Sequence, residues 1–184
     1  MTFNLRLPYD LFLKETMHRE KTINTPIGLI KITAQADALT SVELVGEDVF
    51  ASGKEEAGDE LLEKAASQLM AYFNCESKSF DLPLNWGKIG NFRKKALEET
   101  AKIPWGEVIT YGELARRAGS PNASRAAGGA VASNPFLIVV PCHRVIGSDQ
   151  SLHGFSAGSG LKLKQQLLEL EGHTITNQKV NFKK

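Results

Sequence analysis

The chain has 184 residues and the composition of an ordinary soluble globular protein, enough for one large domain or two small ones. No apolar run approaches the ~20 residues that a membrane helix needs, and the N-terminus lacks the basic and then apolar segments of a signal peptide. We therefore expect a cytoplasmic protein with no membrane partner. Its two cysteines, Cys75 and Cys142, are too few for the disulfide framework of a secreted protein, although a single bridge between them is an open alternative. No Cys/His spacing of the zinc type is present, so we predict no metal site.

The net charge of +1 hides a difference between the two halves of the chain. Residues 1–87 contain 8 Lys and Arg against 14 Asp and Glu, whereas residues 88–184 contain 14 against 7. A basic second half beside an acidic first half favours a polyanionic partner for the second. A surplus of lysines on a solvated surface explains the counts equally well, so charge alone leaves both interpretations open.

The first half predicts a small sheet followed by one helix. Apolar runs at residues 29–34 and 38–45 are separated by turn residues, which is typical of antiparallel strands. Residues 47–58 are polar, and we expect a loop there. From Asp59, a candidate N-cap, apolar residues recur at helical spacing as far as Phe73, which predicts an amphipathic helix.

An extended, proline-containing stretch after this helix indicates a domain boundary, which divides the chain into residues 1–87 and 88–184. In the second domain we expect helices over residues 91–102, 110–119 and 123–132. A short turn with glycine separates the last two helices, which is the helix-turn-helix pattern. In that motif the second helix is the one presented to DNA.

Two adjacent glycines, Gly128 and Gly129, interrupt this second helix. Each costs roughly 1 kcal/mol relative to alanine in a helix interior, so the pair needs a reason. Close packing against another helix and close approach to a nucleic-acid backbone explain it equally well. Arg125 is the one long side chain of the same predicted helix.

Five consecutive apolar residues, 136–140, indicate a fully buried strand or core segment. The run ends at Pro141, which has no backbone N–H and stops regular pairing. Cys142 and His143 follow, so a rigid, dry element ends on a potential nucleophile and a potential base. Because adjacent side chains of an extended segment point to opposite sides, a proton transfer through water fits this pair better than direct contact.

A final helix is expected over residues 161–171, with Gly172 as its stop. Glu171 lies in the last turn, where the helix dipole disfavours an anion by ~0.3–1 kcal/mol. This carboxylate is either simply exposed or held by a cationic or imidazole partner. The preceding loop, residues 154–160, is rich in small residues and carries one aromatic ring, Phe155, so it is either a lid over a pocket or a linker.

Several short motifs together resemble the O6-alkylguanine-DNA alkyltransferases, also called methylated-DNA–protein-cysteine methyltransferases. They are Ile-Pro-Trp-Gly at 103–106, Thr-Tyr-Gly-Glu-Leu-Ala at 110–115, Arg-Ala-Ala-Gly-Gly-Ala at 125–130, Ser-Asn-Pro at 133–135, Pro-Cys-His-Arg-Val-Ile at 141–146 and Leu-Leu-Glu-Leu-Glu-Gly at 167–172. They stand in the order and spacing of the family. The resemblance implies an α/β (α+β) chain with a small ribonuclease-H-like N-terminal domain that has an antiparallel sheet. It also implies a helical C-terminal domain with a winged helix-turn-helix.

The resemblance further implies roles for five residues. Cys142 accepts the alkyl group, His143 takes the thiol proton through a water, and Glu171 orients and charge-balances the imidazole. Asn134 holds the turn that carries the cysteine. Tyr111 rotates the target phosphate and protonates the departing guanine.

The implied substrate is double-stranded DNA that bears O6-alkylguanine, with O4-alkylthymine as a second lesion. The damaged base is flipped out of the duplex. The residues implied to lie along the DNA are Tyr111, Gly112, Ser120, Arg125 and Ser148, with Arg125 filling the gap in the base stack. Those implied to form the base pocket are Phe155, Ser156 and Val145. Nothing in the sequence reverses the thioether product, so we expect one turnover per molecule and no cofactor. We also expect a monomer.

Two features depart from the family pattern and leave the pocket shape open. The aromatic residue of the pocket loop is commonly Tyr and is here Phe155, and the loop from residue 154 to 164 is longer than the usual bacterial form. Two other functions use the same residues. A cysteine hydrolase would turn over repeatedly, and a DNA-binding lesion sensor or regulator would bind without transfer, so stoichiometric alkyl transfer separates repair from both.

Overall fold

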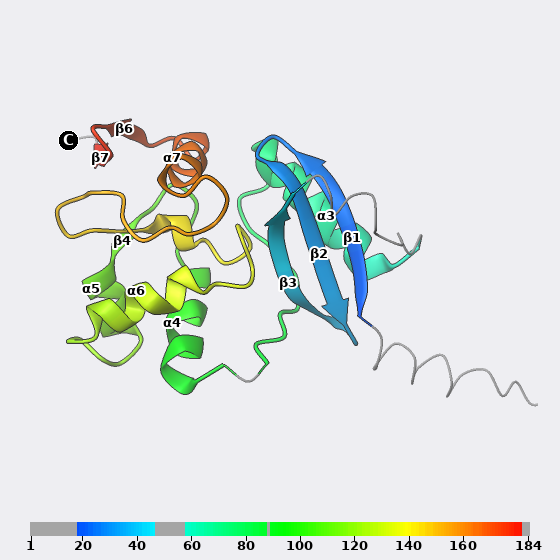
Figure 1. Cartoon of the computed structure of the whole chain (residues 1–184), viewed down its shortest axis with the longest axis horizontal. Coiled ribbons are helices and arrows are strands. Elements are labelled where there is room, and N and C mark those ends of the chain that lie inside the picture. The colour runs from blue at the N-terminus through cyan, green and yellow to red at the C-terminus, as the bar shows by residue number, and fades with distance from the viewer. Residues whose placement is uncertain (1–17, 47–57, 88, 182–184) are drawn as a thin grey trace, which may run out of the picture.

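The structure is a computed structural model that describes residues 18–46, 58–87 and 89–181. The N-terminal stretch expected to lack a signal peptide and the loop expected over 47–58, apart from Gly58, lie outside these residues. Figure 1 shows two lobes side by side, a sheet with one helix and a mainly helical lobe. An antiparallel sheet with its helices packed separately makes an α+β fold, as expected.

The N-terminal lobe is built on a three-stranded antiparallel sheet in the order β1-β2-β3. Strands β2 (Gly28–Gln35) and β3 (Ala38–Val45) confirm the two predicted strands. Strand β1 (Arg19–Thr25) is not predicted, because its residues are mostly polar and show no apolar run. In the structure most of them are only half-buried. Ile30 and Ile32 of β2 are completely buried and face the core.

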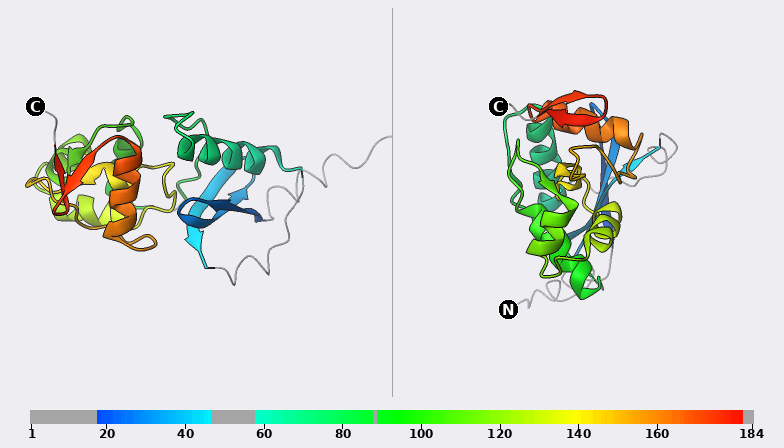
Figure 2. Two further views of the ribbon diagram at one scale, coloured as in Figure 1. Left: turned by 90° about the horizontal axis from the view of Figure 1, so that it is seen from above. Right: turned by 90° about the vertical axis from the view of Figure 1, so that its left-hand side faces the viewer.

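Helix α3 (Glu60–Phe73) covers one face of this sheet, as Figure 2 shows. The Asp59 side chain accepts hydrogen bonds from the backbone N–H groups of Leu61 at 3.0 Å and Leu62 at 3.1 Å, which confirms the predicted N-cap. The side of the helix that faces the sheet is apolar. Its buried residues are Leu62, Ala65, Ala66, Leu69, Tyr72 and Phe73.

The C-terminal lobe is mainly helical. Its elements in chain order are α4 (Asn91–Ala101), β4 (Ile109–Thr110), α5 (Tyr111–Arg117), α6 (Ser124–Ala132), the 3-10 turn η1 (Cys142–Arg144), β5 (Val145–Ile146), α7 (Leu161–Leu170), β6 (Thr174–Thr176) and β7 (Lys179–Asn181). Strands β4 and β5 form a parallel pair, and β6 and β7 form a hairpin. Helices α5 and α6 confirm the predicted helix-turn-helix. Thr110 caps α5 by accepting from the backbone N–H of Glu113 at 3.1 Å.

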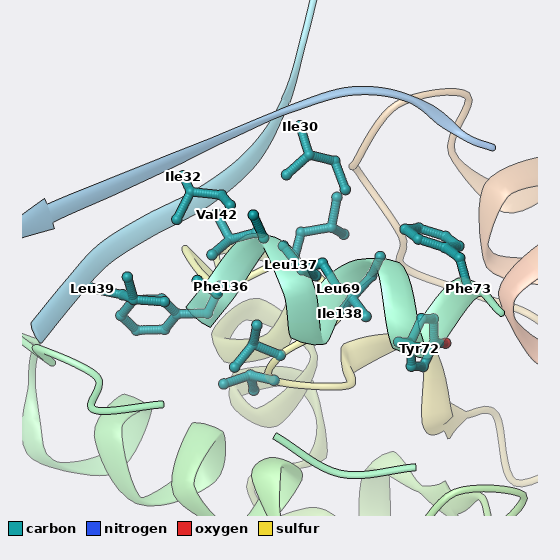
Figure 3. Close-up of a cluster of buried hydrophobic side chains, with 14 of the residues drawn as sticks. Ile30, Ile32, Leu39, Val42, Leu69, Tyr72, Phe73, Phe136, Leu137 and Ile138 are labelled. Carbon is teal, nitrogen blue, oxygen red and sulfur yellow. The ribbon is translucent and has the colours of Figure 1, made fainter. Parts of the chain in front are cut away.

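The apolar run at residues 136–140 is a buried turn, so the strand interpretation is wrong and the core-segment interpretation is confirmed. The backbone N–H of Val42 in β3 donates to the carbonyl of Pro135 at 2.8 Å, and that of Leu137 donates to the carbonyl of Val42 at 2.9 Å. Ile138 reverses the chain with a φ of 69°, which is rare for a β-branched residue. Figure 3 shows Phe136, Leu137 and Ile138 of this run among side chains of the sheet and α3.

One apolar core therefore spans the two lobes. Leu97 of α4 and Leu163 and Leu167 of α7 belong to the same buried cluster as the sheet and α3. The linker between the lobes is also tied to the sheet, because the backbone N–H of Leu39 donates to the carbonyl of Pro83 at 2.9 Å. The domain boundary expected between residues 87 and 88 stays a prediction.

Substitution of Phe136 tests how strongly this shared core couples the unfolding of the two lobes. Its side chain is fully buried and meets the ring of Trp86 edge-on at 5.4 Å. Because the cavity left behind lies between the lobes, Phe136→Ala should lower the free energy of unfolding by about 3–5 kcal/mol in one cooperative transition. Urea titration followed by circular dichroism measures this. The control is Met70→Ala on α3, because Met70 is 37 % exposed and its truncation should change stability by roughly 0.5 kcal/mol or less. Two separate transitions, with only one of them moved, would contradict a shared core.

Candidate active site

Cys142 lines a cavity between the two lobes. It is the first residue of the η1 turn, and its side chain is buried, with 6 % of its surface exposed. The cavity has a volume of about 270 Å³. The wall on the side of the N-terminal lobe comes from residues 42–44 of β3. The C-terminal lobe contributes residues from the end of α6 and from the loop at 155–158. The thiol is therefore screened from bulk water but open to a small group that enters the cavity.

His143 follows Cys142 in η1 and is completely buried. Its Nε2 atom lies 2.8 Å from Oε1 of Glu171, and its Nδ1 atom has no hydrogen-bond partner among the described residues. Because an ionised carboxylate only accepts hydrogen bonds, Nε2 must carry the hydrogen, and Nδ1 keeps a free lone pair. The imidazole is thus a base with one vacant acceptor position.

Glu171 ends α7 as its C-cap and is buried rather than exposed, so the interpretation of a partnered carboxylate is confirmed. Nε and Nη2 of Arg144 donate to its two oxygens, each at 2.8 Å. The hydroxyl of Tyr72 donates to Oε1 at 2.8 Å, and the backbone N–H of Gly106 donates to Oε2 at 3.3 Å. Tyr72 and Arg144 are not among the predicted site residues. The signal for Tyr72 is its position in the buried phase of α3, since a buried phenol needs a polar partner.

Burial and charge set the resting protonation states. Burial raises the pKa of the Cys142 thiol, so the resting sulfur keeps its proton. Burial also lowers the pKa of His143, more than the Glu171 carboxylate raises it. For Glu171, burial raises the pKa, but the hydrogen bonds and charges of His143 and Arg144 outweigh it and hold the value at about 2. The resting site therefore contains a thiol, a neutral imidazole and a carboxylate balanced by guanidinium.

Asn134 clamps the turn that presents Cys142. Its side-chain amide donates to the carbonyls of Phe136 at 3.2 Å and Val140 at 2.8 Å, and its carbonyl oxygen accepts from the backbone N–H of Phe136 at 3.0 Å. These three bonds close the turn around Ile138 in its left-handed conformation. A hydrogen bond from the Asn134 side chain also lowers the pKa of the Cys142 thiol, against the larger effect of burial.

Tyr111 packs against the buried cluster that contains Cys142, and Nζ of Lys164 lies 5.7 Å from the centre of the Tyr111 ring. The Tyr111 hydroxyl donates to the carbonyl of His153 at 2.7 Å. Lys164 is fully buried, although a lysine is not predicted there, and its Nζ donates to the carbonyls of Val145 at 2.6 Å and His153 at 2.7 Å. Burial lowers the pKa of Lys164 to about 8 and raises that of Tyr111 to about 12. The available sequence signal for its burial is position, because Lys164 lies at helical spacing with the apolar residues of α7.

The pocket prediction is only partly met by the geometry. Phe155 and Ser156 line the cavity beside Cys142, which settles the loop as a wall of the cavity rather than a linker. Val145 does not line it, because its side chain is turned into the apolar core of the C-terminal lobe and is completely buried. Gly158 is held close to β3, since a Cβ there would lie 2.8 Å from Leu44 Cδ1.

The residues predicted to lie along DNA are on or beside the helix-turn-helix. Arg125 is exposed in the first turn of α6, and Gly112 is exposed at the start of α5. Ser120 lies half-buried in the turn between the helices, and Ser148 is exposed in the turn after β5. Packing does not account for Gly129, because a Cβ there would meet no described atom within 4 Å. A Cβ at Gly128 would only touch the Tyr111 ring at 3.8 Å.

Other sites are not found in the described part of the chain. The possible bridge is wrong, because Cys75 is exposed and both cysteines are free. None of the helices in the described ranges combines the length and apolar character needed to span a bilayer. Among the same residues, no three His, Cys, Asp or Glu side chains gather as a metal site requires.

The lowered pKa of His143 predicts how stability depends on pH. The unfolded state takes up a proton near the ordinary value of 6.5, whereas the folded state takes it up only at a lower pH. The contribution of the neutral imidazole to the free energy of unfolding should therefore be fully present above pH 6.5 and be lost as the pH drops below that value. The lowered pKa of Glu171 also makes the protein less stable as the pH falls, but only below the ordinary carboxyl pKa of 4.5.

Urea midpoints at about pH 7.5 and about pH 5 measure this difference. His143→Gln should reduce the loss of stability at the lower pH. His173, whose pKa is also lowered but whose side chain is half-buried, gives the matched control His173→Gln with a smaller effect. A loss that is unchanged in His143→Gln would contradict a buried neutral imidazole.

Comparison with known proteins agrees with this geometry. Residues 18–86 match the family described as 6-O-methylguanine DNA methyltransferase, ribonuclease-like domain, and residues 91–173 match its DNA binding domain. The chain is 40% identical over 156 residues to a methylated-DNA–protein-cysteine methyltransferase of Methanosarcina acetivorans, covering 80% of this chain and 94% of the relative. A relative of the same name from Haemophilus influenzae is 38% identical over 150 residues, covering 80% and 82%.

Solved structures give the same result. The crystal structure of Mycobacterium tuberculosis O6-methylguanine methyltransferase superposes with a TM-score of 0.73 at 36% identity, covering 84% of this chain and 93% of that one. A structure of the Mycobacterium tuberculosis protein in complex with DNA superposes with a TM-score of 0.72 at 36% identity, covering 84% and 91%. The chain belongs to the methylated-DNA–protein-cysteine methyltransferase family.

Proposed function

We propose that this protein binds DNA and repairs O6-alkylguanine by moving the alkyl group to the sulfur of Cys142, once per molecule and without a cofactor. The observation that carries the proposal is the vacant Nδ1 of His143, held in a buried imidazole–carboxylate pair directly after a thiol that lines a cavity. The described site is complete within one chain, which supports a monomer. A DNA substrate supports action in the cytoplasm.

The proposed reaction is a displacement at the alkyl carbon. The thiol proton passes through a water to Nδ1 of His143, and the thiolate forms a carbon–sulfur bond as the carbon–O6 bond breaks. The electron pair of the broken bond stays on guanine, which must gain a proton to leave as a neutral base. Tyr111 is the proposed donor, and this requires its hydroxyl to leave the carbonyl of His153. The product is a thioether, which has no acidic hydrogen and no simple route back.

The proposed DNA surface is the exposed side of α5 and α6. A Cβ at Gly129 would meet no described atom within 4 Å, so α6 lets a phosphate backbone approach closely there. Arg125 makes no hydrogen bond with a described residue and is free to enter the duplex. Because flipping a base costs a few kcal/mol, a side chain that fills the gap offsets part of that cost. Gly112, Ser120 and Ser148 are proposed to contact the strand beside it.

A mass measurement tests the transfer. Incubation with a duplex that contains one O6-methylguanine should add a single methyl group to the intact protein, on the peptide that carries Cys142. Cys142→Ala should accept none, while the matched control Cys75→Ala should react fully, because Cys75 is exposed and away from the cavity. Absence of transfer would favour a lesion sensor or regulator, and repeated turnover would favour a hydrolase. The same measurement with O4-methylthymine tests our proposal that this second lesion is also a substrate.

Substitution of Arg125 separates base flipping from chemistry. Arg125→Ala should slow methyl transfer from duplex DNA by roughly tenfold or more, since a few kcal/mol of flipping cost is no longer offset. Transfer from free O6-alkylguanine base should change little, because no duplex has to open. Single-turnover rates with the two substrates give the comparison, with Lys64→Ala, exposed on α3 and outside the proposed DNA surface, as a control that should change neither rate. Equal slowing of both reactions would contradict the gap-filling role.

A further inference from the structure

The N-terminal lobe reaches the reaction centre through one hydroxyl group. Tyr72 is the next-to-last residue of α3 and is fully buried. Its hydroxyl donates to Oε1 of Glu171 at 2.8 Å, and its oxygen lies 3.5 Å from Nε2 of His143. Figure 3 shows Tyr72 at the end of α3, with its side chain directed out of the helix. A residue of the first lobe therefore touches the pair that is proposed to take the thiol proton.

Three aromatic rings fix the direction of this hydroxyl. The Tyr72 ring meets Trp105 edge-on with its centroid at 5.0 Å and Phe73 edge-on at 5.4 Å. Phe80 lies tilted against it at 5.8 Å. Edge-to-face contacts at these distances are favourable and directional, so the phenol has little freedom to follow a moving carboxylate. The ring holds the carboxylate in place, rather than the reverse.

The hydroxyl also stabilises the negative charge of the carboxylate through its hydrogen bond. Oε1 of Glu171 accepts from three donors, which are Nη2 of Arg144, Nε2 of His143 and the hydroxyl of Tyr72. Burial, and then the Glu171 charge, raise the pKa of Tyr72 well above its usual value, so this group remains a donor at every working pH. Without it, the same negative charge would be shared by two donors. The carboxylate would then hold a protonated imidazole more strongly.

We propose that Tyr72 is a positioning residue for alkyl transfer, which fixes Glu171 Oε1 and limits how strongly the His143 imidazole keeps a proton. This inference rests on the function proposed above. It gives the N-terminal lobe a part in the chemistry of a cysteine that lies in the other lobe.

Several other groups bear on the pH dependence and must be held constant. The charged or titratable groups that act on Tyr72 and on the His143–Glu171 pair are Arg144, Cys75, Lys164 and His173. None of them is altered by substitution of Tyr72. A shift seen in such a variant therefore reports the hydroxyl itself.

Tyr72→Phe removes one oxygen atom and keeps the ring inside its aromatic cage. Single-turnover methyl transfer from an O6-methylguanine duplex should fall roughly tenfold at neutral pH, because a hydrogen bond to a buried charge is lost. The acid limb of the rate profile should move to higher pH, since the imidazole becomes protonated earlier. Site-specific 3-fluorotyrosine at the same position is a more acidic phenol and a stronger donor, so the acid limb should move to lower pH.

Leu69→Val is the matched control. Leu69 lies one turn earlier on the same buried face of α3 and carries no polar atom. Its loss of packing should lower stability, while the acid limb stays in place. If Leu69→Val moves the limb as far as Tyr72→Phe does, the effect is one of packing and the proposal is overturned.

A second measurement does not depend on activity. Nitrogen-15 NMR of the His143 imidazole follows its protonation directly, and the midpoint should rise in Tyr72→Phe and fall with 3-fluorotyrosine. An unchanged midpoint in both variants overturns the proposal, whatever the rates. If the unsubstituted protein transfers no methyl group, the proposed function fails on its own. If it transfers normally and Tyr72→Phe matches it in rate and acid limb, only the role of Tyr72 fails.

Discussion

The constraint on which this structure depends is the burial of one carboxylate. A lone charge in a protein interior is strongly disfavoured, so Glu171 must be surrounded by donors before the fold is stable. Those donors come from the turn after α4, from η1 and from α3, and they include Nε and Nη2 of Arg144. The segments that carry the chemistry are thereby fixed by the same interaction that holds the two lobes in register.

The balance of charge explains why the Cys142 thiol is unreactive at rest. Arg144 compensates Glu171, so no unpaired negative charge draws a proton onto His143, and burial keeps the imidazole neutral and the thiol protonated. The proposed proton transfer from sulfur to imidazole creates two opposite charges in a poorly polarisable site, where the nearby cation of Lys164 favours the thiolate. Under the proposed single transfer per molecule, a thiol unreactive at rest is protected from other alkylating and oxidising agents.

Sequence reasoning succeeds where the signal is local and fails where a partner lies far along the chain. Periodicity and caps predict α3, α5 and α6, because each depends on residues within a few positions. The apolar run at 136–140 has no period that separates a strand from a buried turn, and the left-handed Ile138 is imposed by tertiary contacts. Strand β1 is too polar to be recognised alone. Tyr72 and Arg144 look like an ordinary core phenol and an ordinary cation until Glu171 is placed beside them.

The geometry also explains why two dissimilar lobes form one site. The edge of β3 pairs with residues 135–137 and so fixes the turn that carries Cys142, while residues 42–44 of the same strand close the cavity above the sulfur. Helix α3 adds a hydroxyl to the carboxylate behind it. Without the N-terminal lobe, Glu171 would lose a donor and face water, which would weaken the charge relations that keep the imidazole neutral. The first lobe is therefore part of the electrostatic environment of the cysteine, and a description of the site from the C-terminal lobe alone is incomplete.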